Sequence, residues 1–117
     1  MSEATFSLRV FHPSIDPRKI TEELGLPPTT SWSAGEGRME SCWQTRLAGV
    51  ESGHGDVNAA LRDIAARFEP YRFFTEEMRE GGGRVEIAVP GAPSAIDPAL
   101  TRAFAGLNIA LVFAERV

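Results

Sequence analysis

The sequence contains little lysine and cysteine and has no long hydrophobic run. Lys19 is the only lysine among twelve basic residues, and Cys42 is the only cysteine. A single cysteine excludes a disulfide within the chain and is typical of a reducing compartment. No apolar run approaches the roughly 20 residues of a membrane-spanning helix, and the first residues lack the basic-then-apolar order of a signal peptide. The sequence therefore predicts a cytoplasmic protein without a membrane segment.

The chain also lacks an excess of basic residues. Its formal net charge is −4, whereas nucleic-acid-binding domains usually carry a basic patch or excess. We therefore do not expect a nucleic-acid partner. With 117 residues, 43% of them hydrophobic and 24% charged, the composition is that of one globular domain.

Four segments alternate between apolar and polar residues, which is the period of a half-buried β-strand. They are residues 5–10 (TFSLRV), 42–47 (CWQTRL), 84–89 (RVEIAV) and 108–114 (NIALVFA). Together they predict a four-stranded, mainly antiparallel sheet with one apolar face. The opposite face is expected to display Arg9, Arg46 and Arg84. It is expected to lack the stacking aromatic residues of an RNA-binding sheet.

Two segments share a pattern that begins with Ile-Asp-Pro and ends with Gly-Leu. The aspartates are Asp16 and Asp97, and the glycines are Gly25 and Gly106. Aspartate at the N-cap accepts a hydrogen bond from a free helix amide, and the proline that follows it has no amide to leave unpaired. Glycine suits the left-handed conformation that ends many helices. We therefore interpret both aspartates as helix caps rather than as catalytic residues.

Each of these two segments lies between predicted strands, so the chain divides into two β-α-β units. The units span residues 4–48 and 84–117, with a helical insertion at 56–80 that begins with an amphipathic helix. Internal duplication explains the repeated pattern. Two unrelated helices that use the same capping residues would produce the same pattern. Duplicated β-α-β units often form a ferredoxin-like fold. We predict a single α+β domain over residues 1–117, a ferredoxin-like variant whose helices cover one face of the sheet.

Several short motifs along nearly the whole chain resemble one bacterial family. They are ELGLPP at residues 23–28, SAGEG at 33–37, the tryptophan of SCWQT (Trp43) and the closing AGLNIALVF. These motifs and the layout of the elements are similar to the bacterial domain of unknown function 4279. The family name implies no activity, and the resemblance transfers no catalytic residue. Other small bacterial proteins of this type act as immunity or partner-binding proteins, which is an analogy between folds.

No motif predicts catalysis or a bound metal or nucleotide. The residues that could ligate a metal, His12, His54, Cys42 and Asp56, show none of the spacings of a metal site. The glycines at 81–83 lead into a strand, whereas a phosphate-binding loop leads from a strand into a helix. We therefore predict no catalytic residue, no metal and no cofactor, and a lone, partly exposed thiol at Cys42.

The connection at residues 27–41 is the first candidate binding feature. It is long for a loop without secondary structure, and it contains Trp32 and Arg38 among small polar residues. A tryptophan in such a loop can anchor a partner. The alternative is that Trp32 folds back and fills the edge of the core.

The leading hypothesis is a non-enzymatic interaction domain that is partner-binding, immunity-like or self-associating. In it, Arg9, Arg46 and Arg84 select an acidic protein partner or a second copy, and Trp32 supplies apolar contact. A plainly solvated sheet face is the alternative at these positions. The competing hypothesis is a small-molecule sensor or enzyme with a pocket between residues 27–41 and 49–55. That pocket would be lined by Trp32, Arg38 and His54.

Overall fold

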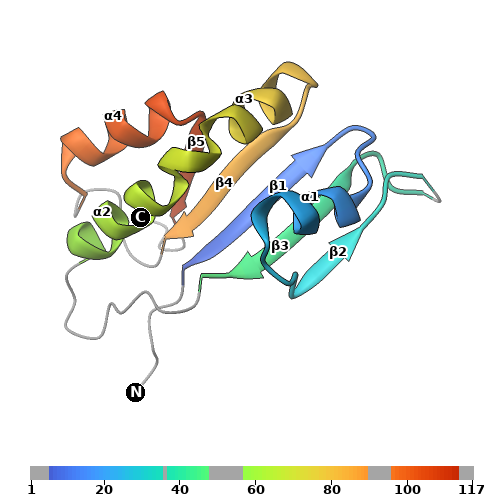
Figure 1. Cartoon of the computed structure of the whole chain (residues 1–117), viewed down its shortest axis with the longest axis horizontal. Helices are drawn as coiled ribbons and strands as arrows, with labels where there is room; N and C mark the ends of the chain where they lie inside the picture. The colour runs from blue at the N-terminus through green and yellow to red at the C-terminus, as the bar shows by residue number, and fades with distance from the viewer. Residues whose placement is uncertain (1–5, 36, 48–56, 90–95, 114–117) are drawn as a thin grey trace.

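The computed structural model contains two layers, a β-sheet and a set of helices that cover one of its faces (Figure 1). It describes residues 6–35, 37–47, 57–89 and 96–113. The elements are, in chain order, β1 (Ser7–His12), α1 (Pro17–Leu24), β2 (Thr30–Trp32), β3 (Ser41–Arg46), α2 (Val57–Phe68), the 3₁₀ turn η1 (Glu69–Tyr71), α3 (Arg72–Glu80), β4 (Arg84–Val89), α4 (Pro98–Gly106) and β5 (Ile109–Phe113). Since α2, η1 and α3 follow one another without a break, they form one helical segment between β3 and β4.

The sheet has five strands in the order β2-β3-β1-β4-β5. All neighbouring strands are antiparallel except β4 and β5, which are parallel. The predicted α+β class and the mostly antiparallel sheet are therefore confirmed. The predicted number of four strands is wrong, because Thr30–Trp32 pairs with β3 as a fifth strand at the edge. Three residues are too few for their alternation to be recognised in the sequence.

The inner face of the sheet forms the core with the helices. Leu8 of the central strand β1 lies in register between Thr45 of β3 and Ile87 of β4, and the side chains of Leu8 and Ile87 are fully buried. The alternation predicted these inner positions correctly in β1, β3 and β4. Trp43 is also fully buried, and its indole nitrogen donates a hydrogen bond to Oγ1 of Thr21 at 2.9 Å. This bond ties α1 to β3.

The two aspartate caps are confirmed. The side chain of Asp16 accepts from the backbone N–H of Arg18, and Asp97 accepts from the N–H of Ala99. Gly25 ends α1 in the left-handed conformation, with φ of 67°. Helix α4 ends at Gly106, as predicted, but this glycine is not in the left-handed conformation. The positive φ of 59° falls on Asn108, a residue type whose short polar side chain tolerates that region.

A pair of glycine substitutions tests how closely β4 approaches β1. A Cβ at Gly83 would collide with the backbone carbonyl oxygen of Phe11, whereas a Cβ at Gly106 meets no atom within 4 Å. We expect Gly83→Ala to destabilise the protein by about 1–3 kcal/mol, as overpacking does. Gly106→Ala is expected to be neutral or to stabilise by up to about 1 kcal/mol, because alanine favours a helix. Urea unfolding measures both, and equal effects would contradict the packing of β4 against β1.

Candidate functional site

The face of the sheet opposite the helices is the candidate site, and we call it the outer face. Every helix from α1 to α4 contributes buried residues to the core cluster on the inner side. The outer face is formed by the alternate strand positions, which are Ser7, Arg9, Phe11, Thr30, Trp32, Cys42, Gln44, Arg46, Arg84, Glu86, Ala88, Ala110 and Val112. Among the described residues, the side chains of these positions themselves therefore cover this face.

One row of side chains crosses the outer face over four strands. The register aligns Trp32 with Cys42, Cys42 with Phe11, and Phe11 with Arg84. We call these four residues the outer row. The prediction that this face carries no aromatic residue is wrong for two reasons. Strand β1 continues two residues beyond the predicted end and so includes Phe11, and Trp32 belongs to the unpredicted strand β2.

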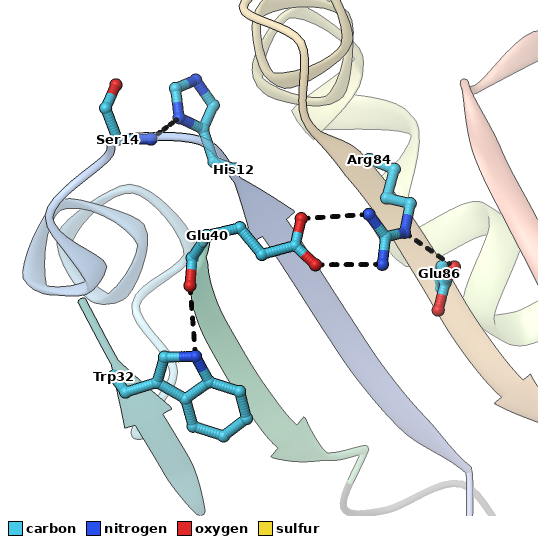
Figure 2. A network of polar contacts seen from close by, with 6 residues as sticks. All are labelled: His12, Ser14, Trp32, Glu40, Arg84 and Glu86. Carbon is cyan, nitrogen blue, oxygen red and sulfur yellow. Dashed lines mark hydrogen bonds and ion pairs between the residues drawn. The ribbon is translucent and has the colours of Figure 1, made fainter. Parts of the chain in front are cut away.

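Arginines lie over both aromatic rings of the outer row. The guanidinium carbon of Arg38 is 4.4 Å from the ring centroid of Trp32, and that of Arg84 is 4.1 Å from the centroid of Phe11. These are cation–π distances. The indole nitrogen of Trp32 also donates to the carbonyl oxygen of Glu40 at 3.2 Å (Figure 2). Trp32 therefore lies on the outer face rather than in the core cluster.

Two glutamates hold Arg84 in place (Figure 2). Its two terminal nitrogens donate to the two carboxylate oxygens of Glu40 at 3.1 and 3.3 Å, and its Nε donates to Glu86 at 3.2 Å. Burial alone would lower the pKa of Arg84, but the hydrogen bonds and charges of these carboxylates outweigh it and raise the pKa. The side chain of Arg84 is 51% exposed, and exposed ion pairs contribute only about 0–1 kcal/mol. The main effect of these bonds is to fix the orientation of the Arg84 guanidinium group.

Three further arginines lie at this face without such a partner among the described residues: Arg9 and Arg46 in the strands, and Arg38 over the ring of Trp32. Among the described residues, Arg9, Arg38 and Arg46 form no ion pair. The Nε of Arg9 is buried and has no hydrogen-bond acceptor in the part of the chain that the structure describes. With Arg84, the described part of this surface contains four arginines and two glutamates, Glu40 and Glu86. This leaves a local excess of two positive charges on a chain whose formal net charge is −4.

Cys42 is buried rather than partly exposed, so that prediction is wrong. Only 2% of it is accessible, because Trp32 and Phe11 flank it in the outer row and arginines lie over both rings. Burial, with a further contribution from the charge of Glu40, raises the pKa of the Cys42 thiol. A thiol in this environment stays protonated at neutral pH and is a poor nucleophile.

The histidines do not join this site. The Nδ1 atom of His12 accepts hydrogen bonds from the backbone N–H groups of Ser14 and Ile15 at 3.1 and 3.0 Å, so it shapes the turn after β1 (Figure 2). His54 lies outside the described residues. Within the described ranges, no group of three histidine, cysteine or acidic side chains could hold a metal ion. No described helix is long and apolar enough to cross a membrane.

A separate cavity of about 400 Å³ opens on the helix side. Its described lining residues are Leu24, Leu26, Pro27, Thr45, Arg46, Leu47, Arg67, Phe68 and Tyr71. Pro27, the first residue of the 27–41 connection, lines this cavity, but Trp32 and Arg38 do not. These two predicted pocket residues therefore do not contribute to the cavity, and the predicted third residue, His54, lies outside the described residues.

Sequence reasoning found the arginines of the outer face and Trp32 but missed Phe11 and Glu40. Phe11 was missed because it is an apolar residue at an outward position of β1, directly after the inward Val10, so it breaks the apolar–polar alternation. The pairing of Glu40 with Arg84, 44 residues apart in sequence, leaves no local signal. Comparisons of the chain with protein-family models, with curated proteins and with solved structures found no match. The residues of the outer face are therefore the only basis for assigning it a binding function.

The reactivity of Cys42 tests how the outer row is packed. Modification by N-ethylmaleimide should be slow at neutral pH and should accelerate only above the ordinary pKa of a thiol, because burial raises the Cys42 pKa. Trp32→Ala removes one neighbour and should accelerate the reaction by about tenfold for each unit by which the pKa falls. Arg46→Gln lies outside the outer row and serves as the control. Equal rates in the wild type and in Trp32→Ala would show that Trp32 does not cover the thiol.

Proposed function

We propose that the protein is a non-enzymatic interaction domain that binds an acidic segment of a protein partner on its outer face. The observation that carries this proposal is the local excess of arginine on an otherwise acidic chain, with Arg9, Arg38 and Arg46 free of carboxylate partners among the described residues. A guanidinium group that pairs with no carboxylate of the described residues can donate hydrogen bonds to a carboxylate of a partner.

The geometry of the arginines favours recognition of carboxylates. The planar fork of arginine matches a carboxylate with two parallel hydrogen bonds, and Arg84 already binds Glu40 in this way. Arg38 is stacked on Trp32, so less conformational freedom is lost when it binds. Tryptophan and arginine are also the residue types that contribute most to many protein interfaces.

The β2–β3 connection adds apolar contact beside these charges. Met39 lies between Arg38 and Glu40 in the sequence and is 96% exposed. Methionine adapts its shape to an irregular apolar surface. A partner that presents acidic residues around an apolar side chain would therefore complement both Arg38 and Met39.

The positive charge of the outer face argues against a second copy of the chain as the binding partner. A second copy that bound outer face to outer face would bring two positively charged surfaces together, and like charges across an interface are repulsive. A different protein with an acidic surface fits better. A homodimer through this face is the result that would contradict the proposal.

Three further assignments belong to this proposal. We infer that β1 to β4 form a ferredoxin-like unit to which α4 and β5 are added. In support, β1 and β2 are separated by β3, and β3 and β4 are separated by β1, as in split β-α-β units. We also infer a cytoplasmic location from the single cysteine, and membership of the domain of unknown function 4279 family from the motifs described above.

Affinity capture from the native host at low salt tests the function. The bait is compared as wild type, as Arg38→Glu, and as Arg62→Glu, which reverses an exposed arginine on α2. A specific partner should be recovered by wild type and by Arg62→Glu. Its recovery should fall by about tenfold, or roughly 1.4 kcal/mol, with Arg38→Glu.

Salt and folding controls complete this experiment. Recovery should also fall in about 0.5 M NaCl, where the screening length is roughly 4 Å. Both variants change exposed side chains, so their melting temperatures should match that of the wild type. If Arg38→Glu retains the partner, or if light scattering shows only a homodimer that Arg38→Glu abolishes, the proposed function is wrong.

A further inference from the structure

The cavity on the helix side has an apolar interior. Its lining includes Leu24 at the end of α1 and Leu26 just after it, together with Phe68 at the end of α2 and Tyr71 of η1. The two aromatic rings lie 6.0 Å apart at a tilt of 57°. A volume of about 400 Å³ is within the range of small-molecule sites, roughly 300–1,000 Å³. The space therefore suits a small apolar group.

The charged groups of the cavity are of one sign. Arg46 and Arg67 line it, and no acidic residue does so among its described lining. Arg67 forms an ion pair with Asp63 at 3.2 Å, whereas Arg46 forms none with any described residue. Arg46 is thus the group best able to bind an anion at the cavity. The hydroxyl of Thr45 already donates to the carbonyl oxygen of Pro27 at 2.7 Å, so it does not compete as a donor.

We propose that this cavity binds a small amphipathic carboxylate, with the apolar tail between the leucines and the aromatic rings and the carboxylate at Arg46. The tail would gain by leaving water, and the charged head would gain a charge-assisted hydrogen bond from the guanidinium. This site shares Arg46 with the outer face but is otherwise separate from the proposed acidic-partner surface, because Trp32, Arg38 and Arg84 do not line it.

Alkyl probes that differ only in the head group test the proposal. The purified protein is titrated by calorimetry with octanoate, octanol and octylamine, each below its aggregation concentration. Octanoate should bind more tightly than octanol, and octylamine should bind most weakly. In the series from hexanoate to octanoate, each added methylene should tighten binding by roughly fourfold, as expected for a buried chain.

Variants locate the binding of octanoate. Arg46→Gln should weaken octanoate binding by about tenfold, because it removes the charged donor, and should leave octanol unchanged. Leu26→Trp should weaken all probes, because the larger side chain fills the space. Trp32→Ala and Arg62→Gln are matched controls outside the cavity and should bind octanoate as the wild type does.

An NMR measurement on the wild-type protein keeps the test independent of whether the variants fold. Nuclear Overhauser contacts should connect the alkyl protons of octanoate with the rings of Phe68 and Tyr71. The proposal is wrong if octanoate does not bind, if the three head groups bind equally, or if the contacts lie elsewhere. The outer-face experiment could still succeed in each case, because it depends on Arg38 rather than on this cavity.

Discussion

The sheet is covered by helices on one face only, and most other features of the structure depend on this. The inner face has α1 to α4 to bury its apolar side chains, and Trp43 joins the layers through its bond to Thr21. The outer face has no such layer among the described elements. The side chains of the outer face must therefore limit the contact of the strands with water themselves.

Arginine and aromatic side chains achieve this cover together. The rings of Trp32 and Phe11 flank Cys42, and the guanidinium groups of Arg38 and Arg84 lie over these rings while both residues stay exposed to solvent. Such side chains can cover apolar surface while they keep a charged end solvated. The same arrangement orients guanidinium groups on the surface that we propose binds carboxylates.

Local sequence patterns predicted much of the fold. The inner positions of β1, β3 and β4, the helical segment between β3 and β4, and the caps at Asp16 and Asp97 all depend on residues close in sequence. Strand β2 was missed because its three residues gain their structure from pairing with β3. The end of α4 at Gly106 was predicted correctly, but the left-handed residue that follows the helix is Asn108 rather than the glycine.

The candidate site was predictable only in part, for a related reason. Alternation placed Arg9, Arg46 and Arg84 on one face, but the strand order decides which of them lie near one another. Glu40, Arg84 and Trp32 come together from separate segments (Figure 2). The cavity is likewise lined by residues from the end of α1, from β3 and from the end of α2, a combination that no local pattern encodes.

The most direct test of the account is to observe the arginine side chains while an acidic peptide binds. In an NMR titration of the ¹⁵N-labelled protein with a glutamate-rich peptide that contains one leucine, the Nε–H signals of Arg9, Arg38 and Arg46 should shift. That of Arg84 should shift less, because Glu40 and Glu86 already occupy it. Shifts confined to Arg62, Arg72 and Arg102 on the helices, or no shift at all, would contradict the claim that the outer face is built to receive carboxylates.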